Sequence, residues 1–376
     1  MHQKLLFFVS LIILLQTTHA QTTYLFIGTY TDGKPDKGIY IYQFNTKNGR
    51  LKSLSTAENI TNPSYITIAP NGRFLYACTD TRLPNAGSVT AFKIDSIHGT
   101  LSLLNKQATN GENPAYVNVH KDNHFVISAN YTGGSVSVFN ANADGSLNSV
   151  AQVITFIDSS INKTRQEKSH IHSAVFSPDY HYIYLPDLGA DKIRAFQWEV
   201  NESQPLIPAD HLLVKTTPGS GPRHFTFHPN QPFAYCVEEL SGTVTAYSYQ
   251  NGKLDAIQSL FAYATKRDSA YSGADIHASP DGRFLYASNR GENRIAIFSI
   301  HPTNGTLQLI GHQSTYGNHP RNFTIDPTGR FLLVANQMTS NIVVFKRNGK
   351  TGLLTRKKGE IKVPNPSCLQ MRTYGK

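Results

Sequence analysis

Apolar and polar positions along the chain recur in units of roughly 45–50 residues, each with a polar turn between short apolar segments. The clearest copies read PSYITIAPNGRFLYACTD at 63–80, ADIHASPDGRFLYASNR at 274–290 and PRNFTIDPTGRFLLVANQ at 320–337. In each unit a third and a fourth segment follow, and these alternate apolar with polar residues. Four short strands in a repeat of this length indicate the blade of a β-propeller.

The pattern within a unit predicts how its strands are buried. We expect inner strands at 63–69, 114–120, 171–177, 222–228, 274–279 and 320–326. Turns such as Asn71-Gly72-Arg73 and Asp281-Gly282-Arg283 supply the positive φ that a tight hairpin requires. The second strands, for example FLYAC at 74–78, are continuously apolar, which is typical of strands covered on both faces.

The two ends of the chain complement each other. The first unit opens directly with a second-type strand at 23–30 and has no inner strand of its own. The missing pattern occurs at the far end, where NPSCLQM at 365–371 matches NPSYITI at 62–68. The sequence therefore predicts an all-β, seven-bladed propeller over 21–376, closed by the C-terminal strand, which completes the first blade.

The first twenty residues do not belong to the repeat. Lys4 precedes an apolar run at 5–15, and Thr18-His19-Ala20 resembles a cleavage site. We interpret 1–20 as a signal peptide cut before Gln21, with an uncleaved anchor as the alternative. The expected protein is exported, periplasmic or secreted, and has no membrane contact after cleavage.

Charge and cysteine content limit the classes of binding partner and the kinds of site that the protein can have. There are 35 Lys and Arg against 25 Asp and Glu, and apart from a cluster at Arg356-Lys357-Lys358 the basic residues are scattered. This pattern argues against nucleic acid and leaves an anionic small molecule open. The cysteines, Cys78, Cys236 and Cys368, provide neither a disulfide framework nor zinc spacing.

Known cofactor and nucleophile motifs are also missing from the sequence, which has no phosphate-binding loop, dinucleotide fingerprint or Gly-x-Ser-x-Gly elbow. The His170-x-His172 pair is the strongest metal-like motif, but the blade alignment implies no carboxylate beside it. We expect no cofactor and no metal.

Alignment of the blades points to a site at one mouth of the central channel. The position after the usual proline of the inner strand is occupied, blade by blade, by Ser64, Ala115, His172, Arg223, Ala274, Arg321 and Ser367. A second ring of positions, at the ends of the second strands, contains Glu239 and Arg290 in adjacent blades.

These aligned positions predict the residues of the site. The predicted catalytic residues are His172, Arg223, Glu239 and Arg290. The candidates for substrate binding are Arg321, His224, Asp275 and His277, with His319 as a weaker candidate. The alternative is a structural ion pair between Arg223 and Glu239. Glu238 is expected to point to the opposite face, because side chains alternate along a strand.

The same residues carry a family resemblance. HSAVFSPD at 172–179, GPRHFTFHPNQPFAYCVEEL at 221–240 and the copies at 274–290 and 320–329 resemble the lactonase family of seven-bladed propellers. That family includes propeller-type 6-phosphogluconolactonases and the fungal 3-carboxy-cis,cis-muconate lactonizing enzyme. The resemblance covers nearly all of residues 22–375. It implies no cofactor and a site of one His, two Arg and one Glu, which fall on His172, Arg223, Glu239 and Arg290.

The expected function is hydrolysis of a small anionic sugar-acid lactone, as in 6-phosphogluconolactonase. Arg223 and Arg290 would hold an anionic group and stabilise the oxyanion. His172 is a better base than Glu239, because flanking arginines lower the pKa of a carboxylate. A carboxymuconate-type lactonizing activity and a non-catalytic binding propeller are the alternatives. Export leaves open whether the lactone is phosphorylated, and the oligomeric state is undetermined.

Overall fold

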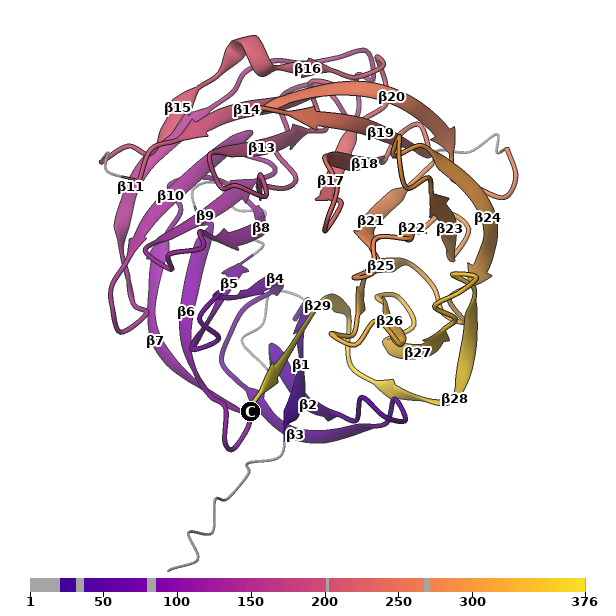
Figure 1. Cartoon of the computed structure of the whole chain (residues 1–376). Helices are drawn as coiled ribbons and strands as arrows, with labels where there is room; N and C mark the ends of the chain where they lie inside the picture. Colours follow the sequence, from indigo (N-terminus) through magenta and orange to yellow (C-terminus); the bar gives the residue numbers. More distant parts are fainter. Residues whose placement is uncertain (1–20, 32–36, 80–85, 201–202, 267–270, 376) are drawn as a thin grey trace, which may run out of the picture.

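The computed structural model describes residues 21–31, 37–79, 86–200, 203–266 and 271–375. The described residues form seven antiparallel sheets, which are arranged as a closed ring around a central axis (Figure 1). The only helical element in them is the 3-10 turn η1 (Asp210–Leu212). No helix among these residues is long and apolar enough to cross a membrane. The predicted seven-bladed, all-β fold is confirmed. The predicted signal peptide at 1–20 lies outside the described residues.

Every sheet runs from the channel to the rim in the order that the sequence predicts. The innermost strands are β29 (Pro366–Tyr374), β4 (Pro63–Ile68), β8 (Pro114–Val119), β12 (Val175–Phe176), β17 (Pro222–Phe227), β21 (Gly273–Ala278) and β25 (Pro320–Ile325). The second strands are β1 (Thr22–Thr29), β5 (Phe74–Thr79), β9 (Phe125–Asn130), β13 (Tyr182–Asp187), β18 (Phe233–Glu238), β22 (Phe284–Asn289) and β26 (Phe331–Asn336). The third strands are β2 (Ile39–Phe44), β6 (Ser88–Asp95), β10 (Ser135–Ala141), β14 (Lys192–Trp198), β19 (Thr243–Gln250), β23 (Arg294–Ile300) and β27 (Asn341–Arg347). The outer strands are β3 (Leu51–Ala57), β7 (Thr100–Ala108), β11 (Leu147–Thr155), β15 (Leu206–Pro208) with β16 (Val214–Lys215), β20 (Lys253–Phe261), β24 (Leu307–Ser314) and β28 (Leu354–Lys362).

The second strands form the core between blades. All six residues of β5, β9, β18, β22 and β26 are buried. A tyrosine in several of these strands also links one blade to the outer turn of the next, because its hydroxyl donates to a glycine carbonyl there. The pairs are Tyr76 with Gly145 at 3.0 Å, Tyr184 with Gly252 at 2.6 Å, Tyr235 with Gly305 at 3.1 Å and Tyr286 with Gly352 at 2.7 Å. The repeat therefore determines both the apolar packing and the polar contacts between neighbouring blades.

The C-terminal strand closes the ring as predicted. Strand β29 pairs antiparallel with β1 from Thr22–Tyr374 to Thr29–Pro366, so the first sheet has the order β29-β1-β2-β3. Figure 1 shows the yellow C-terminal strand beside the indigo first strand. Closure leaves the first blade without an unpaired inner edge.

The fourth blade, β12–β16, departs from the prediction. The inner strand expected at 171–177 is reduced to β12, and Ile171 makes only an isolated bridge to Asp187. The outer edge of this blade is divided between β15 and β16, both of which pair with β14. The segment around His172 is consequently irregular backbone, which lies where a regular strand begins in the other blades.

A β-bulge recurs at the start of the inner strands. The register of β17 against β18 passes from Pro222–Glu238 to His224–Val237, so Arg223 is the extra residue. The same shift leaves Ser64, Ala115 and Arg321 as extra residues in their blades. A bulge bends its strand and re-aims the extra side chain. The aligned position that sequence comparison selects is therefore the one that the fold removes from regular pairing.

Candidate active site

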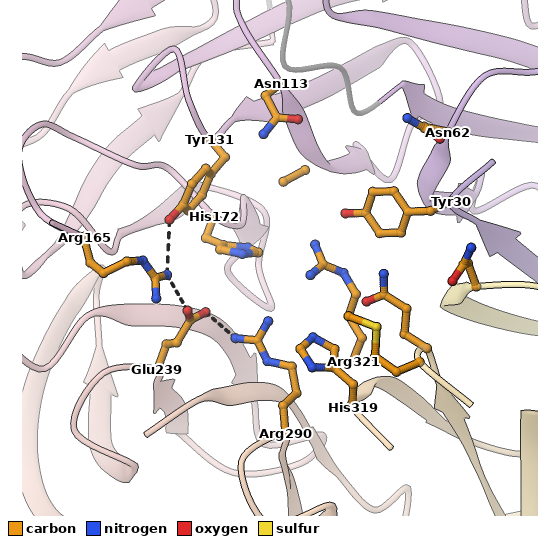
Figure 2. A pocket seen from close by; sticks show the side chains of 14 residues that line it. Tyr30, Asn62, Asn113, Tyr131, Arg165, His172, Glu239, Arg290, His319 and Arg321 are labelled. Carbon is orange, nitrogen blue, oxygen red and sulfur yellow. Dashed lines mark hydrogen bonds and ion pairs between the residues drawn. The ribbon is translucent and has the colours of Figure 1, made fainter. Parts of the chain in front are cut away.

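A pocket of about 660 Å³ opens at the mouth of the channel where the inner strands begin. Its walls come from the ends of second strands, the starts of inner strands and one long loop. The lining residues include Tyr30, Asn62, Asn113, Tyr131, Arg165, His172, Glu239, Arg290, His319 and Arg321 (Figure 2). The structure thus brings four predicted residues, His172, Glu239, Arg290 and Arg321, together in one cavity.

Glu239 is the electrostatic centre of this site. It follows β18, and its carboxylate contacts three guanidinium groups. Arg165 Nη2 lies 2.5 Å from Oε1, while Arg223 Nε and Arg290 Nη2 lie 2.9 Å and 2.7 Å from Oε2. Burial opposes the charge of Glu239, but the three arginines together hold the pKa of its carboxyl well below the ordinary range. Glu239 is therefore an ionised anchor for arginines and a poor proton acceptor.

Arg223 lies beneath the pocket and does not line it. Only 1% of the residue is exposed, and its Nη1 donates to the Ala274 carbonyl while its Nε faces Glu239. The ion pair between Arg223 and Glu239 within one blade is present, as the structural alternative requires. The prediction that Arg223 itself holds the ligand needs correction, because its guanidinium is enclosed by protein. Arg290 and Arg321 are the predicted arginines that reach the cavity.

His172 is buried at the base of the pocket. Its ring lies edge-to-face with those of Tyr131 and His224, each with a centroid separation of 5.2 Å. Burial, reinforced by the charge of Arg223 and by His224 and Arg321, lowers the pKa of His172 well below the ordinary histidine value. Its Nδ1 is buried without a hydrogen-bond partner among the described residues, so Nε2 is the nitrogen that remains for the pocket. A neutral imidazole with an available lone pair is suited to accept a proton.

Arg321 and His319 form the opposite side of the pocket. The Arg321 guanidinium carbon lies 5.2 Å from the centroid of the Tyr30 ring. His319 has a φ of 65°, at the position where Asn62, Asn113, Gly221 and Asn365 also adopt positive φ. Burial and then the charges of Arg290 and Arg321 lower the pKa of His319 to about 4. A histidine in this left-handed conformation at a site is a departure from the usual Asn or Gly.

His224, Asp275 and His277 do not line this pocket, contrary to their assignment as substrate-binding residues. They lie further along β17 and β21 and border a separate cavity of about 230 Å³ with Tyr65 and Tyr116. Side chains alternate along a strand, and the residues that follow the bulge lie deeper in the channel. The blade alignment identified the channel but not the depth of each side chain within it.

The profile of a family described as Lactonase, 7-bladed beta-propeller, matches residues 24–371. The chain belongs to this family.

Similar proteins of the lactonase family span almost the whole propeller. A Formosa agariphila protein named 6-phosphogluconolactonase is 47% identical, over 93% of this chain and 99% of that protein. A Bacillus subtilis protein of the same name is 36% identical, over 92% and 97%. The solved structure of the Pseudomonas aeruginosa periplasmic gluconolactonase, PpgL, superposes with a TM-score of 0.87 at 34% identity and covers 94% of this chain and 99% of that one. The resemblance inferred from the sequence motifs is confirmed.

Sequence comparison of the lactonase repeats missed Arg165. Arg165 lies in the long segment between β11 and β12, outside the aligned strands, and its Nη2 also lies 3.4 Å from the Tyr131 hydroxyl. The extra length of this segment, at 157–169, was the available signal, because additions to a repeat often map to loops on one face. Tyr30 and Tyr131 were missed as well, although both follow second strands, as Glu239 and Arg290 do.

Among the described residues, no group of three or more His, Cys, Asp or Glu side chains is placed to hold a metal ion. His170 instead contacts the Tyr131 carbonyl at 3.0 Å and Glu167 at 3.2 Å. The thiols of Cys78, Cys236 and Cys368 are buried, and none of them forms a disulfide with another described residue. Glu238 contacts the Ser241 and Thr243 hydroxyls, which confirms that it points away from the pocket.

Proposed function

We propose that this protein is a lactone hydrolase that opens the ring of a small anionic sugar lactone in the pocket around His172. One observation carries the proposal. A neutral histidine, with one ring nitrogen left for the cavity, adjoins arginines whose positions are set by a shared carboxylate. The names of the Formosa and Bacillus relatives, both 6-phosphogluconolactonases, support the same chemistry.

The proposed reaction uses His172 as the acid–base group. As water attacks the lactone carbonyl carbon, its proton passes to Nε2 of His172. The bond between the carbonyl carbon and the ring oxygen then breaks, and the imidazolium returns the proton to that oxygen. Arg290 and Arg321 face the cavity and would stabilise negative charge on the carbonyl oxygen in the transition state. Glu239 holds Arg165 and Arg290 in place throughout.

The charge of the pocket favours an anionic ligand. Arg165, Arg290 and Arg321 line it, and Glu239 is the carboxylate among the lining residues that the structure describes. Arg223 adds a further positive charge from beneath. A guanidinium binds carboxylate or phosphate through paired N–H donors. The proposed substrate is therefore a sugar-acid lactone, and the experiment must decide whether it carries a phosphate.

A lactone panel tests the proposal. The purified protein is assayed on 6-phosphogluconolactone, gluconolactone and a carboxymuconate, with spontaneous ring opening subtracted. We expect hydrolysis of at least one sugar lactone, and a KM for an anionic lactone that rises about tenfold or more in Arg321→Ala, as expected for the loss of one charge-assisted contact of at least about 1.4 kcal/mol. Hydrolysis indistinguishable from the spontaneous rate on every lactone would overturn the proposal, and conversion of the muconate would instead support a lactonizing activity.

The proposed location is outside the cytoplasm. The charged and apolar pattern of residues 1–20 and the periplasmic origin stated for PpgL support export. In a bacterial host that expresses the full chain, mass spectrometry of the mature protein is expected to find Gln21 at its N-terminus. Recovery of the intact first twenty residues on cytoplasmic protein would contradict export.

A further inference from the structure

Two buried ring nitrogens near the channel axis lack hydrogen-bond partners among the described residues. They are Nδ1 of His172 and Nε2 of His224, and the two rings lie with centroids 5.2 Å apart at an angle of 71°. A buried polar atom without a hydrogen-bond partner lowers the stability of the fold by about 1–3 kcal/mol. Two such atoms on adjacent rings therefore require an explanation, such as a role in the reaction. Hydrogen bonds in unliganded sites are often long or misaligned and shorten in the reacting complex.

Asp275 determines where His224 carries its proton. Asp275 Oδ1 lies 2.8 Å from His224 Nδ1. The other carboxylate oxygen accepts hydrogen bonds from Asn322 Nδ2 at 2.6 Å and from the Phe323 amide at 3.1 Å, and it contacts His277 Nε2 at 2.9 Å. Burial raises the pKa of Asp275, but the adjacent His277 and His224 hold it well below its usual range, so the carboxylate is ionised. An ionised carboxylate accepts only, and the proton of His224 therefore lies on Nδ1, which leaves a lone pair on Nε2.

Aromatic packing keeps the His224 ring in this orientation. Tyr65 and Tyr116 lie edge-to-face against it, with centroid separations of 6.0 Å and 5.6 Å. Burial and the adjacent Arg223 lower the pKa of His224 to about 4, while Asp275 opposes that shift. His224 is accordingly neutral at physiological pH and presents an acceptor, not a donor, from its buried Nε2.

We propose that His224 and Asp275 are positioning residues for His172, an inference that rests on the proposed lactone hydrolysis. In the reacting complex Nδ1–H of His172 donates to Nε2 of His224, which leaves Nε2 of His172 as the proton acceptor in the pocket. The relay moves no net proton: His172 takes the proton from water and returns it to the ring oxygen, while Asp275 stabilises the transient imidazolium through His224.

The charges around His172 explain why such support is needed. Arg223 from β17 and Arg321 from β25 disfavour a positive charge on this ring, Arg165 and Arg290 line the same pocket, and Tyr131 and His319 are neutral neighbours. Glu239 is shared among three of these arginines. Asp275, which raises the pKa of His277 against the opposing effect of burial, lies on the other side of His224. The Asp275 carboxylate is thus the anion that acts on His172 from the channel side.

The pH dependence of turnover tests the pair. In Asp275→Asn, the amide oxygen can accept from Asn322 and Phe323, but the amide nitrogen then faces His224 Nδ1 and forces its proton onto Nε2, where it opposes the proton of His172. We expect kcat to fall by about 10²-fold or more with little change in KM. The acid limb of kcat/KM should move to lower pH, because loss of the Asp275 charge lowers the pKa of His172 further.

Tyr116→Phe, which keeps the ring against His224, is the control and should keep the wild-type acid limb. A fall in kcat with an unmoved acid limb would indicate a merely structural role and overturn the proposal.

A spectroscopic measurement tests the same idea without activity. The 15N shifts of the His172 ring, assigned with His172→Gln, report its tautomer in the full-length protein. We expect the Nδ1–H form in the wild type and a gain of the Nε2–H form in Asp275→Asn or, if that variant does not fold, in His224→Gln. An Nε2–H tautomer in the wild type would refute the positioning role even if lactones are hydrolysed. The expected tautomer without turnover on any lactone would refute only the proposed function.

Discussion

Glu239→Gln is expected to lower stability more than any other conservative change in the pocket, and to lower turnover as well. The substitution removes the one negative charge that three guanidinium groups share, and Arg223 is almost fully buried beside it. Removal of one partner from a buried ion pair costs about 3–5 kcal/mol, because the remaining charge stays in a poorly solvated place. We expect the free energy of unfolding, measured by urea titration, to fall by about that amount. Release of Arg165 and Arg290 should also lower kcat/KM by about 10²-fold, as expected for displaced positioning groups.

Glu238→Gln is the matched control for this prediction. Glu238 is the adjacent residue and equally buried, but its contacts are with the hydroxyls of Ser241 and Thr243, and burial raises the pKa of its carboxyl. Its neutralisation should therefore cost much less stability. Phosphate added to Glu239→Gln should recover part of the lost stability, because an anion can replace the missing charge. Equal losses in the two variants, with no effect of phosphate, would show that the arginine cluster does not depend on Glu239.

His172→Gln is expected to reduce kcat on a hydrolysed lactone by about 10²–10⁴-fold, the range for loss of a general acid–base group. Stability should fall by only about 1–2 kcal/mol, since no side-chain hydrogen bond within the described residues is lost. KM should change little if the arginines provide most of the binding. Steady-state kinetics at several pH values measure these effects.

The control for His172 is His170→Gln. His170 is also buried and belongs to the same His-x-His stretch, but its ring nitrogens contact the Tyr131 carbonyl and Glu167 and it does not line the pocket. We expect kcat within a few fold of the wild type for this variant. Comparable losses at both positions would point to disturbance of the loop and would count against His172 as the acid–base group.

The repeat made much of the candidate site predictable. Arg321 was found because its position, after the proline of each inner strand, is the bulged residue of its blade. Glu239 and Arg290 were found because the ends of second strands reach the same mouth of the channel. Arg165 was not found, because it comes from a loop that has no counterpart in other blades. The sequence also did not predict how deep in the channel the side chains of His224 and Asp275 lie, because a position shared by all blades does not specify the depth of an individual side chain.

The sequence alone determined the local pattern: strand order, turns, the number of blades and closure by the last strand. These follow from apolar periodicity, from glycine turns with positive φ and from the match between 365–371 and 62–68. The tertiary structure decided which charges meet. Arg223 became the buried support of Glu239, and His224 and Asp275 came to lie behind His172. The physical reason is that ion pairing and burial depend on distances between different blades, which the pattern within a single repeat does not encode.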